Sequence, residues 1–302
     1  MTILVFLLIY AGILVFLVGC VRRVLQYSRT PLHLRWELYP VPHETPERVL
    51  HGGSYFEESE WWKKKQRPNL AGELSFMIPE MLLLKGLWEF NRKLWYRSFP
   101  FHFGLYLLIG AAVFSGLGAI LGRFSFAAAL FTLARCCAWS GLVLTVLGGA
   151  ALFWRRLTDP ELRNYTGLGD LVNVGAFALA CALVILGRFA GDMVTLGTFA
   201  RALLTFDASI KLPAPASAGL ILGSVILAYI PYTHMAHFVA KYFTYHAVRW
   251  DDTPNNARMA VRIAEYLTYR PTWLAPHIGA DGVKTWADVA TTNPTVVPEV
   301  RK

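Results

Sequence analysis

The segment Tyr229-Ile-Pro-Tyr-Thr-His-Met-Ala-His-Phe238 closes the last long apolar run of the chain. Its two histidines, His234 and His237, lie three residues apart, and they follow a proline where an apolar helix should leave the membrane. An ionisable side chain at such a depth costs free energy and usually has a function. One other histidine, His102, lies on an apolar span, in Ser98-Phe-Pro-Phe-His-Phe-Gly104. We therefore expect the rest of the chain to bring these two places together.

The composition is that of a membrane protein. Of the 302 residues, 55% are hydrophobic and only 16% are charged. The apolar residues occur in blocks of membrane-spanning length. The sequence therefore predicts an all-α integral membrane bundle of five transmembrane helices, at about residues 3–21, 99–121, 127–154, 168–187 and 216–243.

The basic residues predict the orientation of the bundle. The net charge of +9 would be compatible with nucleic-acid binding in a soluble protein, but here the charge is distributed by topology. Of the 29 Lys and Arg residues, 24 lie in the segments that follow the first, third and fifth spans. The positive-inside rule then places the N-terminus outside and the C-terminus in the cytoplasm, in a multi-pass protein of the inner (cytoplasmic) membrane.

The predicted spans divide the chain into four parts. Residues 1–21 form the first transmembrane helix, and residues 22–98 form a long cytoplasmic loop that contains an amphipathic interfacial helix at about 78–95. Residues 99–243 form the remaining four-helix bundle, and residues 244–302 form a cytoplasmic tail. None of the four cysteines forms a Cys-x-x-Cys pair, so we expect no iron–sulfur or zinc cluster in this chain.

The two histidine segments are expected at one depth. The second span should start at the cytoplasmic face and the fifth should end there, so at about 1.5 Å per residue the imidazoles lie near one level. Two imidazoles at one depth can bind an iron porphyrin from both faces, which suits electron transfer and leaves no open iron site for oxygen. His102 and His237 are the predicted axial ligands, although His234 shares a face with His237 and is an alternative.

Further side chains at this level could bind the edge of a porphyrin. Guanidinium groups pair well with carboxylates, and three arginines lie at the right level to meet the propionates: Arg97, Arg155 and Arg156. If His237 is the ligand, His234 becomes a donor to a propionate or to a quinone.

Simpler interpretations also fit the histidines. A histidine near a helix end is often only an interfacial residue bonded to a carbonyl group. A metal-transport site is another alternative, but the second span offers one histidine and no carboxylate at that level. Two alternatives at the level of function are a haem-free membrane anchor of a redox complex and a small-solute permease. A permease needs a polar pathway through the membrane, and spans two to four show almost none.

Two motifs carry a resemblance to a known family. The five-span plan, Arg97-Ser-Phe-Pro-Phe-His-Phe-Gly104 and Pro231-Tyr-Thr-His-Met-Ala-His237 resemble the gamma subunit of respiratory nitrate reductase, a membrane cytochrome b, over about residues 1–245. Leu32-His-Leu-Arg-Trp-Glu-Leu-Tyr-Pro-Val-Pro-His-Glu44 and Gly52-Gly-Ser-Tyr-Phe-Glu57 look like a narrower branch. That branch comprises the haem b membrane subunits of the Tmc, Hme and Dsr redox complexes of sulfate reducers and related anaerobes.

The resemblance implies one haem b. The nitrate reductase subunit holds two stacked haems with two histidines on each of two spans, and His102 and His237 match the pair nearer the cytoplasm. The positions that match the other pair are Ala112 and Gly219, and neither residue can bind iron.

The resemblance also implies a function and partners. It implies an electron-transfer subunit of a membrane quinone oxidoreductase complex, not a stand-alone enzyme, which passes electrons between menaquinone and a cytoplasmic iron–sulfur subunit like that of heterodisulfide reductase. The long loop and the tail would dock that subunit. A multihaem cytochrome c outside is a further partner, the protein contacts membrane lipid, and no nucleic acid is implied.

A quinone head needs a polar partner for each carbonyl group and a route for protons. Five residues near the cytoplasmic level are candidates, although each is also an ordinary interfacial or capping residue: Glu80, Lys85, Asp170, Asn173 and His234. The loop histidines His33, His43 and His51 are expected to be structural or interfacial.

Overall fold

The computed structural model describes residues 1–29, 70–163, 166–191, 194–241, 243, 257–271 and 281–291. Within these ranges the regular elements are all helical, and no strand occurs. The chain divides into two compact units, one formed by Met1–Arg23 with Asn69–His237 and the other by Val24–Pro68 with Phe238–Lys302. The loop motifs at 32–44 and 52–57, with His33, His43 and His51, lie outside the described residues.

Five of the described helices are long and apolar enough to cross a membrane, as the sequence predicts. They are α1 (Thr2–Ser28), α5 (Arg92–Ile120), α6 (Ala127–Thr158), α8 (Leu168–Phe189) and α10 (Ala214–Tyr229), the last counted together with the turn that continues it to Tyr232. Large apolar side chains on them point away from the bundle; Ile109 is 63% exposed and Leu147 is 60% exposed. In water such a surface would be costly, whereas in a bilayer it contacts lipid.

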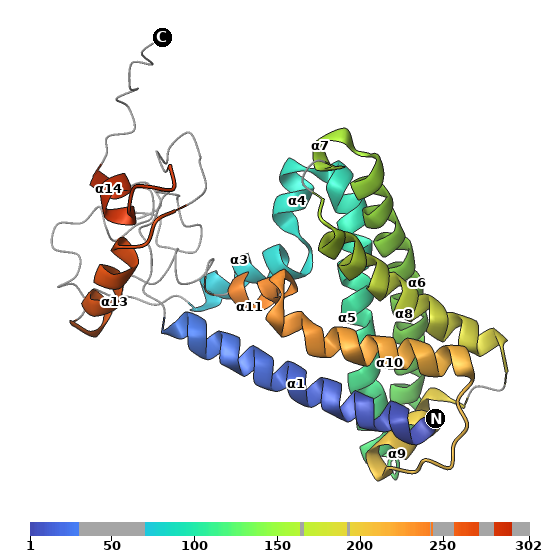
Figure 1. Cartoon of the computed structure of the whole chain (residues 1–302). Coiled ribbons are helices and arrows are strands. Elements are labelled where there is room, and N and C mark those ends of the chain that lie inside the picture. The colour runs from blue at the N-terminus through green and yellow to red at the C-terminus, as the bar shows by residue number, and fades with distance from the viewer. Residues whose placement is uncertain are drawn as a thin grey trace. The chain divides into compact units, whose positions relative to one another are not determined.

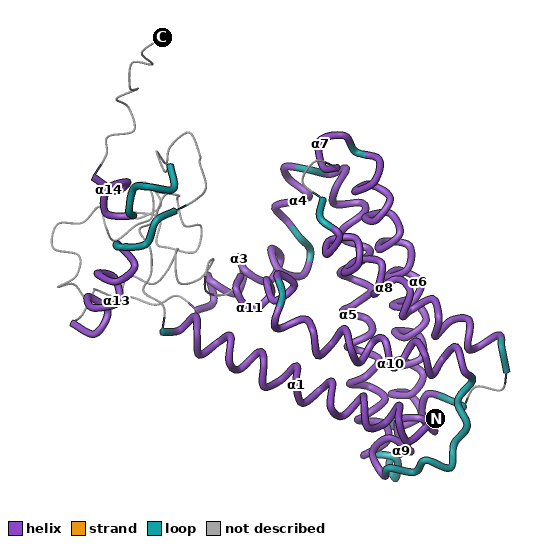
Figure 2. The backbone as a smooth tube through the Cα atoms, viewed as in Figure 1, coloured by secondary structure: helices purple, strands orange, loops and turns teal. Residues whose placement is uncertain are grey.

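The helices of the first unit pack in a regular order. Figures 1 and 2 show α5, α6 and α8 side by side, and α10 packs on α8. The short helix α9 (Leu196–Thr205) packs against α5 and α6. The start of α1 is held by a small core in which Val5 and Phe6 are fully buried beside Ala202 of α9.

Small residues let α5 and α6 approach backbone to backbone. A methyl group placed on Gly104 would lie 2.5 Å from the Thr145 hydroxyl, and one on Gly141 would lie 2.9 Å from the Gly104 carbonyl oxygen. A methyl group on Gly148 would overlap the backbone nitrogen of Phe101. Close approach through small residues is a common way to pack helices in lipid, where the hydrophobic effect does not drive helices together.

The same device joins α1 to α10. A methyl group on Gly12 would lie 2.7 Å from the Ser224 carbonyl oxygen, and one on Gly19 would lie 2.6 Å from the ring of Pro231. The Arg23 guanidinium donates a hydrogen bond of 2.8 Å to the Pro231 carbonyl group. The first helix is therefore held directly against the end of the last span.

The approach to the second span differs from the expected single helix at 78–95. The structure has α3 (Leu70–Leu82) and α4 (Lys85–Phe90), and α5 already begins at Arg92. Leu84 adopts a left-handed conformation (φ 52°, ψ 48°) that separates α3 from α4. The Asn91 side chain caps α5 by accepting the N–H of Leu94 at 3.0 Å. The prediction of one helix is wrong because backbone breaks at Leu84 and Asn91 interrupt the helix although the apolar pattern continues.

The last span is also interrupted. After α10 the chain forms two 3-10 turns, η3 (Ile230–Tyr232) and η4 (His234–Ala236), before α11 (His237–Lys241). Pro231 has no N–H to continue the helix, and Thr233 is extended. The Thr233 hydroxyl accepts the N–H of Met235 and so starts the next turn. A continuous helix to residue 243, as expected from hydropathy, is therefore not what forms.

The second unit contains two short described helices, α13 (Ala257–Leu267) and α14 (Trp286–Thr291). The Trp286 N–H donates to the Tyr269 carbonyl group at 2.9 Å. At the start of α14 the Asp288 carboxylate accepts the Thr285 hydroxyl at 2.7 Å and the Thr285 N–H at 2.9 Å, and these bonds, the hydroxyl first, lower the pKa of that carboxyl group. The tail therefore contains ordered helical elements between its polar stretches.

The packing of α5 on α6 gives a first test, the substitution Gly148→Ala. We expect it to lower the free energy of unfolding in detergent by about 1–3 kcal/mol, because the new methyl group overlaps the Phe101 backbone. Gly116→Ala is the matched control, because no atom lies within 4 Å of the methyl group there. Thermal unfolding of the two variants measures the difference. If Gly148→Ala were as stable as the wild-type protein, or more stable, the close contact of α5 with α6 would be contradicted.

Candidate functional site

His102 and His237 come together in the structure. His102 lies on α5, His237 opens α11, and their ring centroids are 6.2 Å apart with the ring planes at 71°. The two residues are 135 positions apart in the chain, so this approach comes from packing and not from local structure. The His102 side chain is partly exposed and His237 is exposed, so a ligand can reach both rings.

Both rings make the same kind of backbone contact. Nδ1 of His102 lies 2.8 Å from the Ser98 carbonyl oxygen, and Nδ1 of His237 lies 3.3 Å from the His234 carbonyl oxygen. A carbonyl oxygen only accepts, so in each ring Nδ1 carries the hydrogen and Nε2 carries the lone pair. This is the arrangement of metal-binding histidines, whose second nitrogen donates to a carbonyl or carboxylate group.

The spacing of the rings suits a metal atom between them. Two imidazoles that bind one transition-metal ion at about 2 Å each have ring centroids about 6 Å apart. A bare zinc ion would need three or four protein ligands, and the described residues contain no group of three metal-binding side chains. Iron in a porphyrin takes four nitrogens from the macrocycle and only two ligands from the protein. The two histidines therefore fit a haem better than a bare ion.

Phe101 fixes the position of His102. Its ring is buried, packs edge-on to His102 with centroids 5.4 Å apart, and packs edge-on to Phe177 of α8 at 5.6 Å. Gly148 and Gly149 of α6 make room for it. Sequence reasoning missed this role of Phe101, because an apolar residue beside a histidine on a membrane helix carries no distinguishing signal.

The imidazole of His234 lies beside an acidic residue. Its Nε2 is 3.9 Å from Oδ1 of Asp170, whose Oδ2 lies 3.5 Å from Nη1 of Arg156. Oδ2 of Asp170 also accepts the Gly167 N–H at 3.1 Å, which caps the start of α8. The side chain of His234 is 65% exposed, and that of Asp170 is 25% exposed. The structure thus brings together three of the predicted residues: Asp170, His234 and Arg156.

Asn173 lies one turn further along α8 and is buried, with 6% of its surface exposed. Its side-chain oxygen has no hydrogen-bond partner within the described part of the chain. A buried amide oxygen without a partner costs free energy, which favours a ligand or water at this position.

The remaining predicted residues make local contacts. Arg155 pairs with Asp159 at 3.5 Å, and Arg97 donates to the Lys93 carbonyl group at 2.9 Å. The Glu80 carboxylate accepts the Gly86 N–H at 2.8 Å, and Lys85 lies 3.6 Å from Glu89. None of these contacts reaches the cluster of Asp170, His234 and Arg156.

The positions at which a second pair of haem ligands would be expected, Ala112 and Gly219, differ from the pair formed by His102 and His237. Ala112 is an exposed residue of α5. At Gly219 a methyl group would lie 2.7 Å from the Ala180 carbonyl oxygen, so α10 lies directly against α8 there. The structure offers no imidazole at either position, and at Gly219 the helices are in contact.

Comparison with known proteins agrees with the motifs. A family model described as nitrate reductase gamma subunit matches residues 87–251, which is more than half of the chain and includes both histidine segments. No curated protein and no solved structure matches. The family match confirms the resemblance that the two motifs indicate, and it covers α5, α6, α8 and α10. The chain belongs to the nitrate reductase gamma subunit family.

Proposed function

We propose that this chain is the haem b membrane subunit of a respiratory complex and passes electrons between menaquinone and a cytoplasmic iron–sulfur subunit. Membership of the family makes it a membrane cytochrome b that serves as an electron-transfer subunit of an oxidoreductase complex. The observation that carries the proposal is the 6.2 Å separation of the His102 and His237 rings. The proposed orientation, with the N-terminus outside and the C-terminus in the cytoplasm, rests on the distribution of basic residues.

In this proposal His102 and His237 hold the haem iron through Nε2. When bound, such a haem supplies one-electron transfer and has no open position for oxygen. The bonds from Nδ1 to the carbonyl groups of Ser98 and His234 keep each ring in the tautomer and orientation that binding needs. The exposure of both rings leaves space for a large planar ligand.

We propose a single haem in this chain. The lack of an imidazole at Ala112 and Gly219 supports this number, and so does the contact of α10 with α8 at Gly219. Arg97, Arg155 and Arg156 remain the proposed partners of the haem carboxylates. To bind the haem carboxylates, Arg155 and Arg156 would have to leave Asp159 and Asp170 or bind both carboxylates at once. These ion pairs are partly exposed, so little free energy is lost when they open.

The proposed quinone site lies at Asp170, Asn173 and His234. Oxidation of a quinol releases protons as well as electrons, so the site needs a group that accepts a proton. Nε2 of His234 lies 3.9 Å from the Asp170 carboxylate, which in turn lies 3.5 Å from Arg156, so these side chains can take a proton from a bound quinol. The buried, unpartnered amide oxygen of Asn173 can accept a hydrogen bond from a quinol hydroxyl group. Glu80 and Lys85 are weaker candidates, because their contacts are local to the 80–89 segment.

The proposed partners follow from the motifs of the long loop. Residues 32–44 and 52–57 look like the Tmc, Hme and Dsr branch, whose cytoplasmic partner is an iron–sulfur subunit like that of heterodisulfide reductase. We place its docking surface on the loop and the tail, and a multihaem cytochrome c on the outer side. The alternative function is a haem-free anchor of a redox complex. It gives no reason for two histidines of matched tautomer 6.2 Å apart.

Alanine substitutions test the haem ligands. We expect His102→Ala and His237→Ala each to abolish the reduced-minus-oxidised haem spectrum of the purified protein, with the protein still in the membrane, because one imidazole cannot hold the iron from both faces. His234→Ala is the matched control and should keep the spectrum. An unchanged spectrum in either ligand variant would refute the assignment, and a colourless wild-type protein would favour the haem-free anchor.

A methionine substitution separates ligation from folding. We expect His102→Met to retain haem with a raised reduction potential, because a thioether is also an axial ligand and raises the potential relative to histidine. Potentiometric titration of the purified protein measures the shift. An unchanged potential with haem retained would show that His102 does not contact the iron.

The substitution Asp170→Asn tests the quinone site. We expect it to keep the haem spectrum but slow haem reduction by a soluble menaquinol analogue by about two orders of magnitude, the low end of what proton-transfer groups contribute. Asp159→Asn is the matched control, because this carboxylate also pairs with an arginine at 3.5 Å but is not part of the proposed site. Equal rates in the two variants, measured by stopped-flow absorbance, would remove Asp170 from the site.

A further inference from the structure

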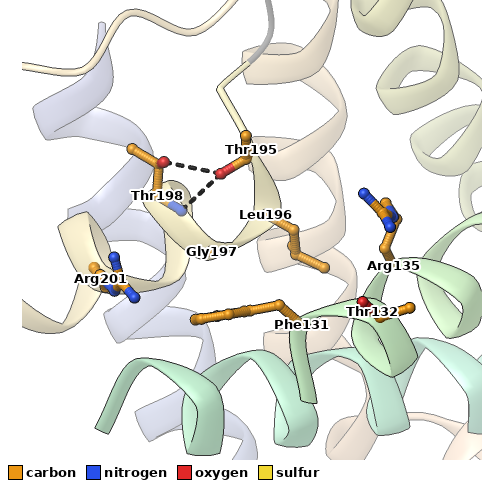
Figure 3. A pocket seen from close by; sticks show the side chains of 8 residues that line it. All are labelled: Phe131, Thr132, Arg135, Thr195, Leu196, Gly197, Thr198 and Arg201. Carbon is orange, nitrogen blue, oxygen red and sulfur yellow. Dashed lines mark hydrogen bonds between the residues drawn. The ribbon is translucent and has the colours of Figure 1, made fainter. Parts of the chain in front are cut away.

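A cavity of about 200 Å³ lies between α6 and the start of α9, both in the first unit. Figure 3 shows Phe131 and Leu196 in its wall, with Arg135 on one side and Arg201 on the other. The other residues that line it are Thr132, Thr195, Gly197 and Thr198. It is smaller than the about 300–1,000 Å³ of typical sites for drug-sized ligands, so a small group suits it better.

The cavity lies at the membrane boundary opposite to the histidine pair. Arg135 and Arg155 are both on α6, 20 residues apart, which is about 30 Å along a helix. The hydrocarbon core of a bilayer is about 30 Å thick. With Arg155 at the boundary near the histidines, Arg135 therefore lies at the level of the head groups on the other side.

Basic residues are scarce at this end of the bundle, and two of them line this one cavity. Only five of the 29 Lys and Arg residues belong to the segments at this end. Neither Arg135 nor Arg201 has a carboxylate partner within the described residues, whereas Arg155 and Arg156 at the other end both do. The Arg201 guanidinium stacks on the Phe131 ring, 5.3 Å from its centroid, which holds one cation at the cavity wall.

The chemistry of the wall selects an anion with several oxygens. The Thr132 hydroxyl donates to the Ala128 carbonyl group at 3.0 Å, and the Thr195 and Thr198 hydroxyls bond to each other at 2.8 Å. The Thr195–Thr198 bond uses one of the two hydroxyl hydrogens, so the side-chain donors left for a ligand are one threonine hydroxyl and the two guanidinium groups. Guanidinium groups bind phosphate and carboxylate oxygens through paired N–H bonds.

We propose that the cavity between α6 and α9 binds a phosphate group through Arg135 and Arg201. An anionic phospholipid of the adjacent leaflet can present it, with its glycerol and first methylene groups on Phe131 and Leu196, and free phosphate has the same chemistry. The site is independent of the haem assignment, because it lies across the membrane from His102.

Binding is tested on the full-length protein in nanodiscs made of phosphatidylcholine alone or with phosphatidylglycerol, whose head group has a net negative charge. Retained lipid is counted by native mass spectrometry as the protein is transferred into detergent. We expect the wild-type protein to retain phosphatidylglycerol over phosphatidylcholine. The double variant Arg135→Gln/Arg201→Gln should lower that preference by about tenfold or more, the effect of losing one or more hydrogen bonds to a charged group. Arg123→Gln is the matched control, because Arg123 lies at the same end and stacks on Phe124 outside the cavity.

A second arm separates the two sources of phosphate. In phosphatidylcholine nanodiscs, inorganic phosphate at millimolar concentration should raise the midpoint of thermal unfolding of the wild type, but not of the double variant, if the free anion is the ligand. A size-exclusion profile that is unchanged in all variants shows that they fold, whether or not haem is bound. If the double glutamine variant fails to fold, Arg135→Lys/Arg201→Lys replaces it and should weaken retention while keeping the charge. Equal retention of both lipids by the wild type, together with no effect of phosphate, would overturn the proposal.

Discussion

The close contact of α5 with α6 is the constraint on which the rest of the structure depends. In lipid, helices gain no hydrophobic energy from association, so they must pack closely and through small residues. Gly104, Gly141 and Gly148 let the two backbones approach to a distance that no side chain would permit. Phe101 fits against Gly148 and reaches Phe177 of α8, which ties three helices together one residue away from His102. The position of that imidazole is thus set by backbone packing.

The interruption of the last span gives its two histidines separate places. On a continuous α-helix, residues three apart project from one face, and His234 and His237 would compete for one site. Pro231 ends the helix, Thr233 is extended, and a 3-10 turn carries the chain to α11. His237 then faces His102, and His234 faces Asp170. In the proposed function His237 binds the haem iron and His234 exchanges protons with the quinone. The break in the helix lets these two neighbouring residues face different partners.

The two ends of the bundle differ in how their charges are balanced. At the end with the histidines, Arg155 and Arg156 both pair with carboxylates. At the opposite end, Arg135 and Arg201 line a cavity without such a partner among the described residues. A cation at a membrane boundary is stable in either setting, but only the second leaves it to bind an external anion. The difference suits a subunit that handles protons at one end and binds a phosphate group at the other.

Hydropathy alone determined the five spans, because a helix is the one local structure that satisfies its backbone hydrogen bonds within lipid. The equal depth of His102 and His237 also followed from sequence, since the rise per residue converts position into height. The breaks at Leu84 and Pro231 were missed, because they depend on backbone conformation and capping within segments whose apolar pattern continues. Only the tertiary structure decided which imidazole faces His102 and that Arg135 and Arg201 share a cavity. Those neighbours come from helices far apart in sequence, and the direction in which they face is set by the packing of small residues and not by the residues themselves.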